Sequence, residues 1–445
     1  MRTAAATGRL EGSRPALSGR LTSDAKHAFA YFEAGRATLE GLTAREERME
    51  VHDALRPVRS DFMARHAEAV YAELTAGFRD EIRVEELVFE AAERFPGLLP
   101  TREAIAAERR LPQAEKEGLE VDQGVFLARL LASPRAGLHL VHTMLRPRRR
   151  ALDRLDEFRV TGSADLGLAH LERRGRIGHL ELRNPRFLNA EDDGATAALE
   201  IGVDLVLLDP QIEVGVLRGG TVDHPRYAGR RVFNAGINLT HLYHGQISFV
   251  NFMIARELGL LSKIYRGHWT GGDFESGLEE TSEKPWMAAV ESFAIGGGCQ
   301  LLLVMDRVIA ERGSYFNLPA RKEGIVPGSA NLRLPRLVGE RAARQAIMFE
   351  RAFQADSAEG ALLCDRLVED SQAMDVAIEE DAAQLTSSGA VSVAANRKAM
   401  RVGLEPVDAF RRYMAVYARE QSLCMHSPAL IRNLEDNWNA KQRRL

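Results

Sequence analysis

The sequence predicts an α/β core flanked on both sides by helical regions, and three observations support this. Helical spacing dominates the first 150 or so residues, short apolar strands then alternate with helices, and helical spacing returns from Arg341 onward. Strand and helix in alternation favour a layered α/β arrangement with largely buried strands. We therefore predict a flexible tail (1–20), a helical N-terminal domain (21–170), an α/β core (171–340) and a helical C-terminal part (341–445).

In the N-terminal region, Thr43 and Glu46 have the spacing of a capping box before a long amphipathic helix that ends near Phe78. Helical spacing continues over 84–95 and 123–131, with prolines in the intervening turns. Residues 1–18 are polar and rich in Ala, Gly and Ser, without an apolar stretch. We interpret them as a frayed tail and not as a signal peptide.

The pattern changes near Gly175, where strand-like alternation of apolar and polar residues begins. Short, apolar segments rich in β-branched residues predict strands, and longer apolar segments predict helices. The predicted strands are 176–183, 212–217, 287–293 and 307–310, and the predicted helices are 195–208 and 297–305.

The composition excludes several classes of protein. A formal net charge of -4 argues against nucleic acid as a partner. No run reaches the roughly 18 apolar residues that a membrane-spanning helix needs. The three cysteines (Cys299, Cys364 and Cys424) are too scattered for a disulfide framework or a zinc site, so we expect a reducing, cytoplasmic location.

Two glycine-centred loops, at 233–239 and 294–300, are the strongest candidates for a functional site. Three glycines before a helix let a ligand approach backbone N–H groups at the positive helix end. If the loops face each other, they can form an oxyanion hole. The alternative is that Gly296–Gly298 merely packs a helix tightly on a sheet. A nucleotide phosphate site fits less well, because the spacing matches neither dinucleotide nor Walker loops.

Together with the segments 184–190 and 316–328, these loops resemble four motifs of the crotonase (enoyl-CoA hydratase/isomerase) superfamily, in that family's order. The resemblance starts near Gly175 and implies a ββα spiral core that binds acyl-CoA thioesters. It implies that the oxyanion donors are the N–H groups of Ile237 and Gly297. The residues it places at the substrate or coenzyme A are Arg186, Asn189, Ala190, Asn234, Ala235, Gly236 and Gly296.

The departures from the hydratases narrow the resemblance. Hydratases have catalytic glutamates where this chain has Gln300 and Ala320, neither of which exchanges a proton at neutral pH. With its helical N-terminal extension, the chain is similar to the 3,5-dihydroxyphenylacetyl-CoA dioxygenases, which serve the dihydroxyphenylglycine branch of glycopeptide (vancomycin-type) antibiotic biosynthesis. That resemblance implies oxidation of an arylacetyl-CoA by O2 to the arylglyoxylate and free CoA, with no metal and no organic cofactor.

The same resemblance assigns the remaining site residues. Glu191, Arg256 and Gln300 would contact the ring hydroxyls, and Ile237, Ala320 and Ile325 would line an oxygen pocket. From local sequence alone, Arg256 could instead form a surface ion pair, and Glu191 could be a helix N-terminal charge. The group that removes the α-proton stays open between a phenolate, a bound water and Glu191.

Metal ligation and assembly complete the predictions. We find no trustworthy metal-binding spacing, and we interpret His241 and His244 as structural or solvated. Crotonase-type enzymes are commonly homotrimers or homohexamers, so we expect homo-oligomerisation, with the C-terminal part helping to form contacts and close the acyl-CoA site. The alternatives are another crotonase-type enzyme (a thioesterase, dehalogenase or decarboxylase) or a non-catalytic acyl-CoA-binding protein. For a dehalogenase nucleophile the third motif offers only Glu323.

Overall fold

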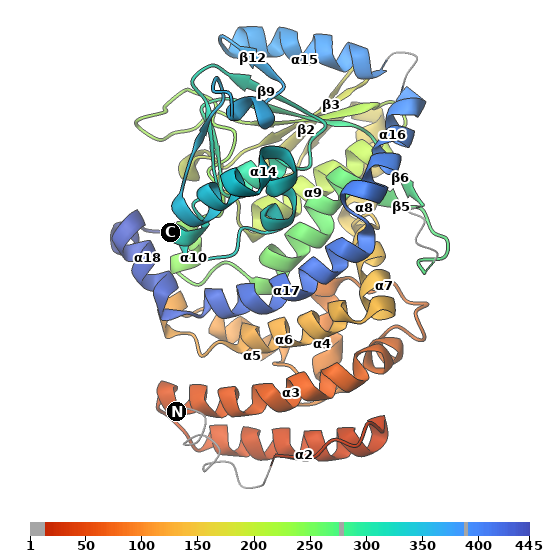
Figure 1. Ribbon diagram of the computed structural model, residues 1–445, viewed down its shortest axis with the longest axis vertical. Helices are drawn as coiled ribbons and strands as arrows, with labels where there is room; N and C mark the ends of the chain where they lie inside the picture. The colour runs from red at the N-terminus through yellow and green to blue at the C-terminus, as the bar shows by residue number, and fades with distance from the viewer. Residues whose placement is uncertain (1–13, 276–279, 387–389) are drawn as a thin grey trace.

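The computed structural model describes residues 14–275, 280–386 and 390–445, so most of the predicted tail (1–20) lies outside the described residues. Helices form one end of the molecule, and a sheet covered on both faces forms the other (Figure 1). The N-terminal helices are α2 (Leu21–Glu40), α3 (Arg45–Leu74), α4 (Val84–Arg94), α5 (Arg102–Glu108), η1 (Gln113–Glu115), α6 (Leu119–Ala132), α7 (Pro134–Met144) and α8 (Arg149–Thr161).

The main sheet has seven strands in the order β1-β2-β3-β4-β7-β9-β12. From β3 onward every pair is parallel, whereas β1, β2 and β3 are antiparallel. Parallel strands buried on both faces read as nearly continuous apolar runs, which explains why β4 and β7 were recognisable in the sequence. The strands are β1 (Ser163–Asp165), β2 (Ala169–Arg174), β3 (Ile177–Leu182), β4 (Val214–Gly219), β7 (Trp286–Val290), β9 (Arg307–Glu311) and β12 (Arg366–Val368).

Alternate residues of the sheet serve two different cores. Val216 and Met287 belong to a cluster with α15 (Ser371–Thr386) on one face. Leu217 and Ala288 belong to a cluster with α9 (Asp193–Leu208) on the other face. Because side chains alternate along a strand, each strand contributes to both layers.

The C-terminal helix α17 (Val407–Met425) joins the two ends of the molecule. It lies between the N-terminal helices and the α/β core (Figure 1), and its buried residues share one apolar cluster with α3, α6 and the segment 249–258. The N-terminal and C-terminal helical parts therefore have a common core.

Ion pairs also attach the N-terminal helices to the core. The fully buried carboxylate of Glu200 in α9 accepts from Arg83 (2.9 Å) and Arg148 (2.7 Å), and Lys263 completes the cluster at 2.7 Å. Arg148 belongs to the basic run 146–150, and the structure places it at the junction between the N-terminal helices and the α/β core.

The remaining elements surround the candidate site or connect the layers. A second sheet (β11-β10-β8) lies beside the glycine turns, and β5 pairs with β6. The bounds are η2 (Pro185–Phe187), α10 (Leu239–Tyr243), η3 (Phe249–Ile254), η4 (Arg256–Leu261), α11 (Ser262–Arg266), β5 (His268–Trp269), β6 (Thr281–Ser282), β8 (Phe293–Ile295), α12 (Gly297–Leu302), β10 (Tyr315–Asn317), α13 (Ala320–Glu323), α14 (Ala330–Phe349), β11 (Phe353–Gln354), η5 (Gly360–Leu362), α16 (Ala390–Leu404), α18 (Pro428–Trp438) and η6 (Ala440–Gln442).

Two local predictions differ from the structure. The predicted capping box at Thr43 is wrong: α3 begins after Ala44, and no side chain caps it. Two acidic residues in its first turn supply favourable charge at the helix start instead. The predicted strand 287–293 is two strands, β7 and β8, which separate at Glu291 and Ser292 and belong to different sheets.

Candidate active site

The two glycine turns predicted to cooperate meet in the structure. An isolated bridge joins Asn234 to Ala294, and the N–H of Ile295 donates to the carbonyl of Asn234 at 3.0 Å. A Cβ atom built on Gly236 would lie 3.1 Å from the nitrogen of Gly297 and 2.8 Å from the carbonyl oxygen of Ile295. The turns are therefore in direct contact, close enough for one carbonyl oxygen to reach N–H groups from both.

The backbone directs two N–H groups away from the bonds that hold the turns. Ile237 pairs with Glu191 through the carbonyl of Gly236 and the N–H of Asn238, each at 2.7 Å, so the N–H of Ile237 itself points away from Glu191. Gly297 is the first residue of α12, where an N–H has no partner inside its own helix. Paired N–H groups of this kind can stabilise a developing oxyanion.

Replacing Gly236 with alanine is expected to destabilise the fold and lower activity. Gly236 has φ +82°, so alanine pays about 1–2 kcal/mol for a left-handed conformation. Its Cβ would also press on the second turn, where overpacking adds about 1–3 kcal/mol. Gly313→Ala is the matched control, because Gly313 has φ +83° with nothing within 4 Å of the added atom. Chemical denaturation of both variants measures the difference, and equal losses would contradict the contact between the turns.

A buried arginine connects the predicted polar residues behind the turns. Arg256 is 3% exposed, and all five of its N–H donors have protein acceptors. It forms a bidentate pair with Glu191 (both contacts 2.8 Å), and its other donors reach Glu257 (2.9 Å), Gln300 (2.8 Å) and the carbonyl of Gly297 (2.8 Å). One guanidinium therefore fixes both carboxylates, the amide and the second glycine turn.

The ion pairs of Arg256 favour its charged form. Burial alone would lower its pKa, but the ion pairs with Glu191 and Glu257 raise the pKa above its ordinary value. The alternative of a surface ion pair is therefore wrong, because the ion pair that Arg256 forms with Glu257 is buried. Glu191 likewise lies fully buried, and is not a solvated charge before α9.

Arg256 lies on a stretch of unusual backbone. The helix-like run expected from the sequence consists of two π-helical segments, η3 and η4, joined at Ala255. Such i→i+5 turns are rare and are often found at functional sites. Hydrophobic periodicity does not distinguish them from an α-helix, so this geometry could not be predicted from the sequence.

A small cavity lies against the turns. Its volume is about 20 Å³, close to the room for one water molecule. Four of the predicted site residues line it: Ile237, Arg256, Gly297 and Gln300, joined by the predicted pocket residue Ile325. The other lining residues are Phe252, Met253, Glu257, Glu323, Val326, Gly328 and Tyr417. The predicted pocket residue Ala320 is buried at the start of α13 but is not among the lining residues.

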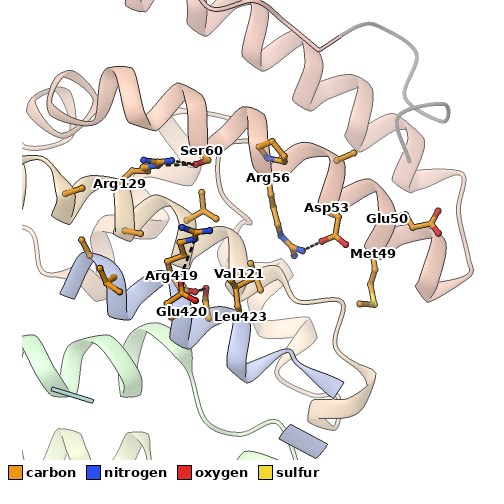
Figure 2. Close-up of a pocket in the computed structure, with 18 of the residues that line it drawn as sticks. Met49, Glu50, Asp53, Arg56, Ser60, Val121, Arg129, Arg419, Glu420 and Leu423 are labelled. Atoms are coloured by element: carbon orange, nitrogen blue, oxygen red, sulfur yellow. Dashed lines mark hydrogen bonds and ion pairs between the residues drawn. The ribbon is translucent and has the colours of Figure 1, made fainter. Parts of the chain in front are cut away.

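A much larger cavity, of about 970 Å³, lies elsewhere, between α3, α6 and α17 (Figure 2). Residues such as Met49, Arg129 and Leu423 line it, and none of the predicted site residues does. Because the oxyanion donors lie at the small cavity, we assign the candidate active site there, despite the difference in size.

The residues expected at the substrate or coenzyme A divide into two groups. Asn189 is fully buried, and its amide donates to the carbonyls of Gly220 (2.8 Å) and Val232 (2.7 Å). Asn234 donates to Glu191 at 2.9 Å and accepts from the N–H of Gly236 at 2.6 Å. Both side chains thus shape loops and are not left free for a ligand.

The second group lies closer to the surface or contributes backbone. Arg186 is exposed, and its guanidinium donates to the carbonyl of Leu445 at 2.6 Å. Ala235 is half-buried beside the first turn, whereas Ala190 and Gly296 are buried. Asn184 donates to the carbonyl of Ala190 at 2.8 Å.

The two histidines past the first turn have protein partners. His241 pairs with Asp192 at 3.0 Å, and His244 lies 3.1 Å from the carbonyl oxygen of Arg443. Within the described ranges, no group of three or more His, Cys, Asp or Glu side chains could hold a metal ion. Across the same residues, none of the helices combines the length and apolar character needed to cross a bilayer.

Three of the polar cavity residues were not among the site residues predicted from the sequence: Glu257, Glu323 and Tyr417. Glu257 could have been found as the neighbour of Arg256. Tyr417 comes from α17, which the sequence places far from the motifs, so no local signal connects it to them.

Comparisons with known proteins identify the family of this chain. The sequence model of the family described as Enoyl-CoA hydratase/isomerase matches residues 172–427. A relative from Amycolatopsis orientalis, (3,5-dihydroxyphenyl)acetyl-CoA 1,2-dioxygenase, is 48% identical over 387 residues, which is 87% of this chain and 88% of the relative. Crotonyl-CoA hydratase of Syntrophomonas wolfei is 29% identical over 57% of this chain and 88% of its own length.

A solved structure has the same fold. The enoyl-CoA hydratase from Bacillus halodurans superimposes with a TM-score of 0.50 at 18% identity, covering 61% of this chain and all of that one. The hydratases thus match little more than half of this chain. The match to the Amycolatopsis relative is too long to omit the N-terminal helices.

Proposed function

This chain belongs to the enoyl-CoA hydratase/isomerase family, and from that premise we propose that it is a cofactor-independent dioxygenase. Its reaction is the conversion of 3,5-dihydroxyphenylacetyl-CoA and O2 to 3,5-dihydroxyphenylglyoxylate and free CoA. The observation that carries the proposal is the 48% identity to the Amycolatopsis dioxygenase over 87% of the chain, including helices that the hydratase matches do not cover.

The cavity supports a reaction other than hydration. Gln300 occupies one of the two positions where hydratases have a glutamate, and Ala320 occupies the other. An amide and a methyl group cannot deliver the elements of water to a double bond. The oxyanion donors are retained, so the site can still stabilise an enolate.

The mechanism follows from these parts. The N–H groups of Ile237 and Gly297 hold the thioester oxygen, so that loss of an α-proton places negative charge where donors already point. The aryl-conjugated enolate passes one electron to O2, and the resulting radicals combine to form a Cα–O bond. The terminal peroxide oxygen then attacks the thioester carbon and expels the CoA thiolate. Loss of the second α-proton, with cleavage of the O–O bond, gives the arylglyoxylate.

The walls of the cavity suit a small apolar gas. Ile237 and Ile325 line the space beside the oxyanion donors, with Phe252 and Met253 also lining it, and we propose this as the oxygen pocket. Ala320 is buried nearby at the start of α13, the helix that carries Glu323.

Recognition of the ring rests on the network around Arg256. Because its five donors already have acceptors, we propose that Arg256 and Glu191 hold Gln300 and the second turn in place. Gln300 accepts from Arg256 through Oε1, which leaves its amide nitrogen as the donor for a ring hydroxyl. Arg186, which is exposed, is the candidate for a coenzyme A phosphate.

We also propose that the enzyme is a homotrimer or homohexamer, as its family commonly is, and that it acts in the cytoplasm. The three cysteines are free in the structure, which suits a reducing compartment.

Oxygen uptake with thiol release tests the function. Purified protein, dialysed against chelator, is mixed with 3,5-dihydroxyphenylacetyl-CoA while dissolved oxygen and free thiol are followed together. We expect equal amounts of O2 consumed and CoA released, with activity unchanged by the chelator. Thiol release without oxygen loss would indicate a thioesterase, and neither signal would indicate a binding protein.

A further inference from the structure

Glu323 is a buried carboxylate that the mechanism above does not use. It ends α13, is 3% exposed and lines the cavity with Ile237 and Gly297. Its Oε1 lies 3.6 Å from where a Cβ of Gly296 would be, so the carboxylate faces the second glycine turn.

Glu323 differs from the other carboxylates of the site because it has no partner in the part of the chain that the structure describes. Glu191 and Glu257 are both paired with Arg256, and Glu257 also accepts from the N–H and hydroxyl of Ser329. Among the residues described, no hydrogen bond or ion pair involves the carboxylate of Glu323. Burial of a carboxylate without a partner costs free energy, so its presence beside the oxyanion donors indicates a role in the reaction.

The reaction needs a group that accepts and returns protons. Turnover removes both hydrogens from Cα, and the products take up one proton on the CoA thiolate. A single group can meet these needs if it accepts a proton, passes it to the thiolate and then accepts again. The two positions where hydratases have a glutamate, Gln300 and Ala320, offer no such group.

We propose that Glu323 is the general base that removes the α-proton, an inference that rests on the proposed function. In the first step the Cα–H bond breaks, its electron pair forms the enolate double bond, and the proton moves to the carboxylate. The neutral acid then protonates the departing CoA thiolate. As a carboxylate once more, Glu323 takes the second α-proton while the O–O bond breaks.

The surroundings suit proton exchange near neutral pH. Burial raises the pKa of Glu323 to about 7, where a base works well at physiological pH. The titratable groups that face it across the cavity are Arg256 and Glu257 from η4 and Tyr417 from α17. Burial raises the pKa of Tyr417 well above its ordinary value, so its phenol stays protonated. On α13 itself, Arg321 and Lys322 pair with Glu350, away from the cavity.

Hydrogen exchange without oxygen tests this role separately from oxygenation. Wild type and Glu323→Gln are incubated anaerobically with 3,5-dihydroxyphenylacetyl-CoA in D2O, and deuterium at Cα is followed by mass spectrometry. We expect wild type to exchange both positions. Glu323→Gln should exchange at about one hundredth of the wild-type rate or below. The matched control is Glu340→Gln, because Glu340 is 70% exposed on α14, and we expect it to exchange like wild type.

Binding and pH measurements keep the outcomes distinct. Glu323→Gln should bind the substrate with nearly wild-type affinity by calorimetry and keep its circular dichroism spectrum. If it does not fold, Glu323→Asp replaces it, and its exchange rate should rise with pH between 6 and 8, as in wild type. Exchange by Glu323→Gln at the wild-type rate, or exchange by Glu323→Asp that does not vary with pH, would overturn the proposal. Wild-type exchange without oxygen uptake under air would refute the dioxygenase function while leaving the base assignment intact.

Discussion

Replacing Ile237 with proline is expected to lower kcat by about a hundredfold, the usual loss when one oxyanion donor is removed. Proline has no N–H, so the thioester oxygen would keep only the donor from Gly297. The fold should tolerate the change, because the pairing with Glu191 uses the carbonyl of Gly236 and the N–H of Asn238. Initial rates of oxygen uptake over a range of substrate concentrations measure kcat and KM separately.

Ile237→Val is the matched control, because it keeps the N–H and the β-branched wall of the cavity. We expect its kcat to stay within a fewfold of wild type. A folded Ile237→Pro enzyme with wild-type kcat would show that this N–H does not hold the oxyanion. An increase in KM alone would show that the donor stabilises the bound substrate and the transition state equally.

Replacing Arg256 with methionine is expected to lower the free energy of unfolding by about 3–5 kcal/mol. Arg256 is the shared partner of Glu191 and Glu257, both nearly or fully buried, so methionine would leave two carboxylates without their cation. The second glycine turn would also lose the donor to the carbonyl of Gly297. Urea denaturation followed by circular dichroism measures the change.

Two further variants serve as controls for the Arg256→Met measurement. Arg344→Met removes an arginine that is 60% exposed and paired with Glu340, and it should change stability by less than about 1 kcal/mol. Glu191→Leu combined with Arg256→Met removes the main pair together and should recover part of the loss. If Arg256→Met were no less stable than Arg344→Met, the buried network would not be a source of stability.

The order of motifs was enough to predict the family and the α/β fold, and both predictions are confirmed. The reason is physical, because an oxyanion hole needs backbone without side chains at fixed places. A Cβ on Gly297 would lie 2.7 Å from the Oε1 of Glu191, so this requirement is visible as a glycine in the sequence. The roles assigned to individual site residues stay predictions.

What the sequence could not predict depends on distant contacts. Tyr417 reaches the cavity from a helix near the C-terminus, and Glu257 acquires its place from π-helical backbone that hydrophobic spacing does not reveal. Asn189 and Asn234 were expected at the ligand because motifs do not distinguish a side chain that binds from one that shapes the loop. Only the hydrogen-bond partners separate the two cases.

The small volume behind the glycine turns has a consequence for how substrate arrives. Pockets for drug-sized ligands usually measure about 300–1,000 Å³, whereas the cavity here has room for about one water molecule. An aryl ring can therefore occupy it only if part of the lining swings outward first. Ile325 and Val326 are half-buried, whereas the other residues that line the cavity are buried, so the part of the lining expected to move is the short segment around Ile325. Part of the binding energy of the ring would then be used to move this segment.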